Sequence, residues 1–109
     1  MPQPLITVIM PVYNAERTIE TALKSIRMQT IPAEDIEILV IDGGSTDQSR
    51  EIARKYGAVV IDNPLRLPEP AKRIGLQCAQ GRYVVRQDSD EELLTNDQLQ
   101  RRLELFQHF

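Results

Sequence analysis

Along this 109-residue chain, short continuous apolar runs alternate with segments in which apolar and polar residues are mixed. Nearly continuous apolar and β-branched runs, typical of strands buried on both faces of a parallel sheet, cover residues 5–10, 36–41, 58–61 and 83–85. After each run, apolar residues recur at the spacing of an amphipathic helix. Pro11 is expected to end the first strand. The pattern predicts a strand followed by a helix, repeated along the whole chain.

The helix boundaries are predicted from capping signals. Asn14 is a plausible N-cap for the first helix. Ser45, with Gln48 three residues later, has the pattern of a capping box for the second helix. Pro70 suits the first turn of the third helix, and apolar positions within residues 96–109 suggest a terminal amphipathic helix.

This order of elements predicts one α/β domain over residues 1–109, with a mostly parallel sheet and helices on both of its faces. Three of the four strands end in a carboxylate, namely Asp42, Asp62 and Asp88. Open α/β sheets bind ligands beyond the carboxyl ends of their strands. If these strands are neighbours, their polar ends converge on one crevice.

Composition narrows the class of protein. The chain is 41% hydrophobic and 27% charged, as an ordinary globular protein is, and its net charge of −3 argues against nucleic acid as the main partner. A single cysteine, Cys78, fits a reducing compartment and is expected to be a small core residue. No stretch approaches the roughly 20 apolar residues of a membrane helix. We therefore expect a soluble, cytoplasmic chain.

Candidate chemistry lies directly after the fourth strand, in Asp88-Ser89-Asp90. Carboxylates on alternate residues can offer hard oxygen ligands to Mg²⁺ or Mn²⁺, and the metal can bridge to a diphosphate. The alternative is an acidic turn in solvent, because Asp and Ser are ordinary turn residues. Taken alone, the motif favours the solvated turn. Evidence from other segments of the chain is needed to distinguish a metal site from such a turn.

Two other nucleotide-binding classes are disfavoured. A dinucleotide-binding fold has glycines after its first strand, where this chain has Pro11-Val12-Tyr13-Asn14. The chain also has no G-x-x-x-x-G-K-[ST] sequence, which excludes a P-loop NTPase.

Three segments together resemble the family-2 glycosyltransferases: residues 11–16, 40–47 and 88–90, in the family's order and at about its spacing. The resemblance extends over residues 6–92. It implies a GT-A fold and inverting transfer of a sugar from a nucleotide diphosphate sugar, with a UDP-sugar favoured. It also implies a Mn²⁺ or Mg²⁺ cofactor, and an unknown carbohydrate or lipid-linked acceptor in polysaccharide or glycolipid synthesis.

The resemblance implies site residues where the motifs match. Nucleotide contacts are expected from Pro11, Tyr13, Asn14, Asp42, Lys72 and Asp88. Asp42 would accept the N–H of a uracil ring, Lys72 would face the diphosphate, and Asp90 would bind the metal together with Asp88. The alternatives are a packed aromatic for Tyr13, a helix-start acid for Asp42 and a solvated helix face for Lys72.

The chain departs from the family pattern at two positions. Gly43 stands where the family often has a second acid, which leaves the preferred base open. Arg86-Gln87 replaces two residues that are usually apolar, and Arg86 becomes a candidate contact to the diphosphate or the acceptor.

Family catalytic domains are roughly twice as long as this chain, and their general base follows the Asp-x-Asp motif. We therefore expect no catalytic residue in this chain, a general base beyond Phe109, and no sugar transfer by the chain alone. A full-length parent could be membrane-associated. Uncovered strand edges and helix faces predict self-association. The second hypothesis is a non-catalytic nucleotide- or partner-binding module.

Overall fold

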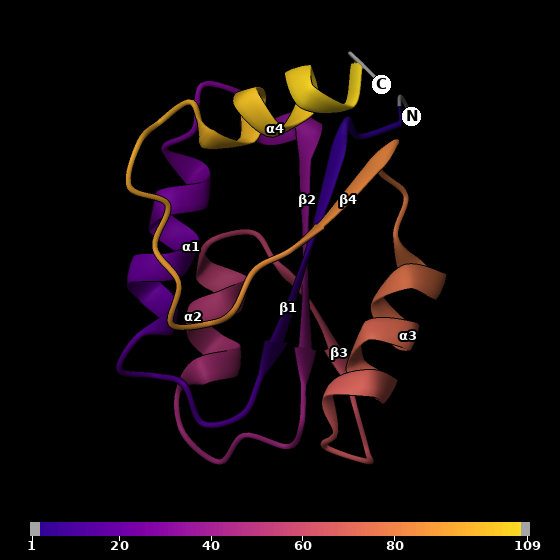
Figure 1. The fold of residues 1–109 in the computed structure, drawn as a ribbon. Helices are drawn as coiled ribbons and strands as arrows, with labels where there is room; N and C mark the ends of the chain where they lie inside the picture. The colour runs from indigo at the N-terminus through magenta and orange to yellow at the C-terminus, as the bar shows by residue number, and fades with distance from the viewer. Residues whose placement is uncertain (1–2, 108–109) are drawn as a thin grey trace.

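The structure, a computed structural model, describes residues 3–107 (Figure 1). Its strands are β1 (Ile6–Val12), β2 (Ile36–Asp42), β3 (Val59–Asp62) and β4 (Tyr83–Arg86). Its helices are α1 (Ile19–Arg27), the short 3₁₀ helix η1 (Ala33–Asp35), α2 (Ser49–Lys55), α3 (Pro68–Cys78) and α4 (Gln98–Gln107). The predicted alternation of strands and helices is confirmed.

The strands form one parallel sheet in the order β3-β2-β1-β4. The central strand β1 pairs with β2 over its whole length and with β4 over Ile6–Ile9 only. Helices α1 and α2 cover one face of the sheet and α3 covers the other (Figure 1). The predicted fold class, a parallel sheet with helices on both faces, is therefore confirmed.

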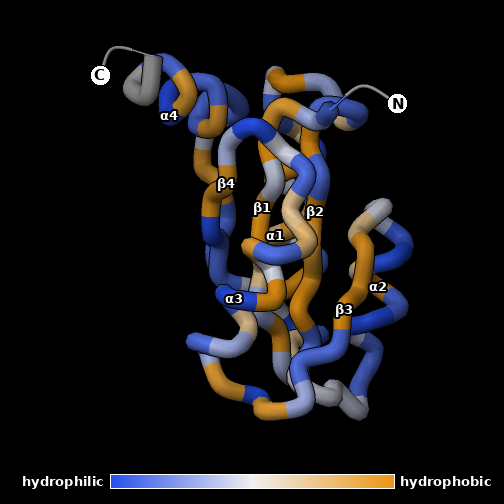
Figure 2. The backbone as a smooth tube through the Cα atoms, turned by 90° about the vertical axis from the view of Figure 1, so that its right-hand side faces the viewer, coloured by the Kyte–Doolittle hydropathy of each residue, from blue (hydrophilic) through white to orange (hydrophobic). Residues whose placement is uncertain are grey.

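Each face of the sheet has its own apolar cluster. The larger cluster packs alternate residues of β1 and β2, such as Val8 and Ile38, against α1, α2 and α4. The smaller cluster joins Ile9, Leu39 and Ile41 to α3. Figure 2 shows β1 and β2 as almost continuous hydrophobic stretches between hydrophilic loops. Successive side chains of a strand point to opposite faces, so burial on both faces explains why these runs lack polar alternation.

The prediction that Pro11 ends the first strand is wrong, because β1 continues to Val12. Proline lacks an N–H and is tolerated where a strand needs no donor. The Ile9 carbonyl accepts the N–H of Gln87, whereas the Val12 carbonyl accepts the N–H of Gly43 beyond β2. Pro11 therefore lies where β1 faces the side of β4. Because β4 ends at Arg86, no residue of β4 pairs with Pro11, and the lack of an N–H at Pro11 costs no ladder hydrogen bond.

Two further observations concern α3 and the helices in general. The expectation of a buried Cys78 is wrong: α3 buries only Ala71 and Gly75, and the thiol in its last turn is exposed.

Within residues 3–107, no helix combines the length and the apolar character that crossing a membrane requires.

The α3–β4 turn requires glycine at position 81. A Cβ on Gly81 would lie 2.5 Å from the backbone nitrogen of Thr7, and the Gly81 N–H donates to Thr7 Oγ1 at 2.8 Å. We expect Gly81→Ala to lower the free energy of unfolding by about 1–3 kcal/mol, as overpacking does. Urea denaturation measures this, with the exposed substitution Gln77→Ala as a control. An unchanged midpoint for Gly81→Ala would contradict the close approach.

Candidate functional site

The order of the strands places a topological switch point between β1 and β4. The chain moves outward from β1 through β2 to β3 and then returns to the opposite side of β1 with β4. Ligands of open α/β sheets bind at such a switch point, beyond the carboxyl ends of the strands. Two cavities lie between this edge of the sheet and α3, and Pro11 lines both of them.

The first, which we call the cationic cavity, has a volume of about 190 Å³. It is lined by Ile9, Pro11, Lys72, Leu76, Val84 and Arg86. Its two cations come from α3 and from the end of β4. Nη2 of Arg86 lies 3.3 Å from Oδ1 of Asp88, and both side chains are more than half exposed. The cavity can therefore receive an anion beside an accessible carboxylate.

The second, which we call the aromatic cavity, has a volume of about 120 Å³. Pro11, Val12, Tyr13, Ile41, Gly43, Asn63, Arg66, Leu67, Pro68 and Ala71 line it. The Arg66 guanidinium lies 4.7 Å from the centroid of the Tyr13 ring, and its Nη1 donates to the Tyr13 hydroxyl at 3.2 Å. This cation–π pair joins the β1–α1 loop to the β3–α3 loop at the cavity.

Asn63 lines the aromatic cavity and has an amide oxygen that lies buried beside it. The residue is buried, and its Nδ2 donates to the carbonyl of Leu67 at 3.1 Å. Its Oδ1 is buried and has no hydrogen-bond partner among residues 3–107. A buried acceptor left unpaired costs free energy that a ligand N–H could recover.

The carboxylate of Asp42 is occupied within its own loop. The side chain is fully buried. Its Oδ1 accepts the Ser45 hydroxyl at 2.5 Å, and its Oδ2 accepts the N–H groups of Gly44 and Ser45 at 3.1 and 2.9 Å. Nε of Arg50 lies 3.9 Å from Oδ2. Asp42 lines neither cavity, and its contact with a base stays a prediction.

Asn14 does not cap the first helix, so that prediction is wrong. Thr18 precedes α1, and Asn14 has a positive φ of 48°. The Asn14 Oδ1 accepts the N–H of Thr46 at 2.8 Å, and its own N–H donates to Ser45 Oγ at 2.8 Å. Because β1 and β2 are neighbours, the loops after them lie side by side and satisfy each other's polar groups.

The predicted capping box is wrong for the same reason. Gln48 donates its N–H to Oε2 of Glu16 in the other loop, not to Ser45. Asp47 accepts the N–H of Glu16 at 3.1 Å and that of Ser49 at 2.9 Å. Burial alone would raise the pKa of Asp47, but the hydrogen bonds from Ser49 and Glu16 outweigh it and lower the pKa. The two loops thus form one braced unit.

Asp88 and Asp90 lie in an exposed turn after β4, and Asp88 contacts Arg86, which lines the cationic cavity. The Glu91 N–H donates to the Asp88 carbonyl at 3.0 Å and closes the turn. Within residues 3–107, no three histidine, cysteine or acidic side chains could hold a metal ion on their own. Two exposed carboxylates fit Mg²⁺ or Mn²⁺ when water and a phosphate ligand supply the remaining oxygens.

Comparison with known proteins identifies the family. Residues 7–108 match glycosyl transferase family 2. The chain belongs to this family. The resemblance inferred from the three short motifs is thereby confirmed.

Relatives and solved structures of glycosyltransferases share the fold. An uncharacterized glycosyltransferase of Haemophilus influenzae is 39% identical over 113 aligned residues, which cover 94% of this chain and 42% of that protein. The structure of S. aureus TarS 1–349 in complex with UDP-GlcNAc superposes with a TM-score of 0.84 at 28% identity, covering 95% of this chain and 31% of TarS 1–349.

A third protein, glucosyl-3-phosphoglycerate synthase from Mycobacterium tuberculosis, was solved with Mn²⁺, UDP and glucosyl-3-phosphoglycerate. It is 31% identical with a TM-score of 0.65, covering 82% of this chain and 36% of the synthase. The family-2 chain described here therefore spans less than half the length of these relatives.

The structure brings together only some of the predicted residues of this family-2 chain. Pro11, Tyr13 and Lys72 line the two cavities, and Asp88 contacts Arg86 of the cationic cavity, with Asp90 two residues further along the exposed turn. Asn14 and Asp42 lie in the braced loops instead. Sequence reasoning missed Asn63 and Arg66. Asn63 directly follows β3, at the carboxyl edge of the sheet, and this position could have identified it as a candidate. No comparable signal marked Arg66.

Proposed function

We propose that this chain is the donor-binding part of an inverting, metal-dependent glycosyltransferase that uses a nucleotide diphosphate sugar, with a UDP-sugar favoured. The observation that carries the proposal is the pair of adjoining cavities at the switch point, one aromatic and one cationic, beside two exposed carboxylates. The UDP-GlcNAc complex of S. aureus TarS 1–349 and the UDP complex of the M. tuberculosis synthase, whose structures are similar to this chain, support it. The acceptor is a carbohydrate or a lipid-linked carbohydrate.

The aromatic cavity suits the nucleobase. Its volume of about 120 Å³ is of the order of one pyrimidine ring, and Tyr13 supplies an aromatic side chain at its edge. Asn63 Oδ1 is a neutral acceptor without a partner and can accept an N–H of uracil. In this arrangement Arg66 shifts to admit the base, and Asp42 keeps the shape of the neighbouring loop through its hydrogen bonds.

The cationic cavity suits the diphosphate. Lys72 and Arg86 approach it from two different elements, and their charges offset those of the phosphate oxygens. Asp88 and Asp90 would hold Mn²⁺ or Mg²⁺, and the bound metal would stabilise the departing nucleotide. Nη2 of Arg86 lies 3.3 Å from Oδ1 of Asp88, and the second carboxylate oxygen of Asp88 would be available to the metal.

The general base and the acceptor site belong, in this proposal, to protein outside residues 1–109. The length of the relatives supports this, since the chain spans 42% of the H. influenzae protein. An inverting transfer needs a base positioned at the acceptor hydroxyl. Glu91, Glu92 and Asp97, which follow Asp90, are only a few residues from the metal turn.

Titration calorimetry with UDP and with uridine tests the proposal. We expect Mn²⁺-dependent binding of UDP, and we expect Lys72→Gln to lower UDP affinity about tenfold, because one charge-assisted contact to a phosphate is lost. Uridine affinity should stay unchanged, since uridine carries no phosphate. Arg73→Gln, the next residue on the same exposed helix, is the matched control. Absence of UDP binding by the parent chain, or equal losses for UDP and uridine, would overturn the proposed diphosphate site.

A further inference from the structure

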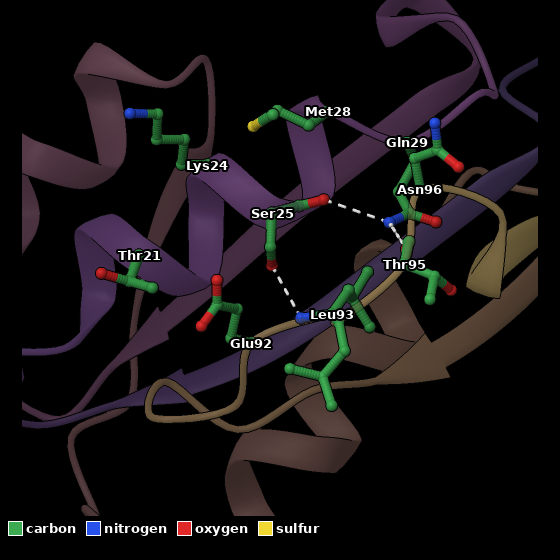
Figure 3. A pocket seen from close by; sticks show the side chains of 10 residues that line it. Thr21, Lys24, Ser25, Met28, Gln29, Glu92, Leu93, Thr95 and Asn96 are labelled. Atoms are coloured by element: carbon green, nitrogen blue, oxygen red, sulfur yellow. Dashed lines mark hydrogen bonds between the residues drawn. The ribbon is translucent and has the colours of Figure 1, made fainter.

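The segment that follows the Asp88-Ser89-Asp90 turn is held mainly by side chains rather than by regular structure. No helix or strand covers residues 87–97. A cavity of about 570 Å³ lies between α1 and residues 92–96 (Figure 3). Leu94, on its wall, is 84% exposed. Leu93 packs into the core, whereas the outer side of the segment, which includes Leu94, gains little from apolar packing.

Ser25 makes the first attachment of this segment to α1. The buried Ser25 hydroxyl donates to the Ala22 carbonyl at 2.7 Å. It accepts the N–H of Leu93 at 3.0 Å (Figure 3). Only two residues separate Leu93 from Asp90, so their Cα atoms lie within about 11 Å of each other. The position of Leu93 consequently limits where the metal turn can lie.

Gln29 makes the second attachment, four residues after Ser25 and just beyond the end of α1 at Arg27. Its Nε2 donates to the carbonyls of Thr95 at 2.8 Å and Ser25 at 3.2 Å, and its Oε1 accepts the N–H of Leu99 at 3.1 Å. The side chain is buried. One amide hydrogen of Gln29 thus bonds to Ser25, whereas the other amide hydrogen and the amide oxygen fix the segment and the start of α4.

The other end of the turn is also fixed. The Gln87 N–H donates to the Ile9 carbonyl at 3.0 Å, and the buried Gln87 side chain donates to the Glu91 carbonyl at 2.8 Å. The two carboxylates therefore lie between an anchor on β1 and an anchor on α1.

We propose that Ser25 and Gln29 are positioning residues for the metal site: from α1 and the turn that follows it, they fix the segment after Asp90 and thereby set the geometry of Asp88 and Asp90. The inference rests on the proposed function, because it takes the turn as the metal site. Metal ligands bind well only when held close to their productive positions, and loss of supporting hydrogen bonds typically lowers metal affinity about tenfold or more.

Calorimetry with UDP, with and without Mn²⁺, tests this proposal. We expect Ser25→Ala to reduce the Mn²⁺-dependent gain in UDP affinity about tenfold while metal-free UDP affinity stays within about twofold of the parent. Ser25→Thr, which keeps the hydroxyl, should retain the gain. Gln29→Met removes the second attachment and should act as Ser25→Ala does, which gives a second test if one variant folds poorly.

A control for stability is needed because both residues are buried. Ala53→Gly weakens α2 at a buried position on a helix that makes none of these bonds, and it should lower stability without reducing the Mn²⁺ gain. A full gain in both Ser25→Ala and Gln29→Met would overturn the inference, as would an equal loss in Ala53→Gly. If the parent chain shows no Mn²⁺ gain, the proposed metal site itself fails, and this inference with it.

Discussion

Replacing Asp90 by alanine is expected to remove most of the gain in UDP affinity that Mn²⁺ provides, while weak metal-free binding survives. Asp90 is exposed in the turn, and in the proposed site it is a direct oxygen ligand of the metal. The residues proposed for the base and the diphosphate, such as Asn63 and Lys72, line separate cavities and are not altered. We expect a loss of at least about tenfold, or 1.4 kcal/mol, in the presence of Mn²⁺.

Titration with UDP, with and without Mn²⁺, measures the effect directly. Glu92→Ala is the matched control, because it removes an exposed acid two residues further along without altering the turn. Comparison of the two variants separates a specific ligand from a general loss of negative charge. If Asp90→Ala kept the full Mn²⁺ effect, the turn would be an ordinary acidic turn, and the proposed metal site would fail.

The fold was predictable because burial on both faces leaves a strong local signal. The runs at β1 and β2 lack polar alternation since each strand packs against two clusters. The alternation of strands with helices then selects a parallel sheet. The error at Pro11 has a nonlocal cause. Whether a proline interrupts a strand depends on the neighbour it faces, and β4 ends before it reaches Pro11.

The capping predictions failed because Asn14 and Ser45 have partners far away in the sequence. Both residue types are good caps, but here they bond across two loops that only the pairing of β1 with β2 brings together. The same limit applies to Arg66, which contacts Tyr13 from 53 positions away. Tyr13 and Lys72 could be proposed from motifs, whereas the two cavities that they line depend on how α3 packs on the sheet.

Asp42 illustrates how a site motif can have a structural role. An acid at the end of a strand could equally face a ligand or its own loop, and sequence alone does not distinguish the two. In the structure the buried carboxylate accepts three hydrogen bonds from Gly44 and Ser45. Ser45 in turn accepts the N–H of Asn14, so the carboxylate supports both braced loops.

We therefore expect Asp42→Ala to reduce the free energy of unfolding by about 3–5 kcal/mol. The substitution leaves two backbone N–H groups and the Ser45 hydroxyl without their acceptor, and it removes the partner of Arg50. This loss is a large fraction of the roughly 5–15 kcal/mol that stabilises a typical domain. Urea denaturation of the variant and the parent gives the difference.

Asp62→Ala is the matched control, because Asp62 occupies the paired position at the end of β3 and is exposed. It should change stability by no more than about 0.5 kcal/mol. The same samples, titrated with UDP under conditions where Asp42→Ala is still folded, separate the two roles of Asp42. An unchanged stability together with a loss of UDP affinity would assign Asp42 to the base and contradict its role in the loops, because a carboxylate that supports the loops cannot be removed without cost to the fold.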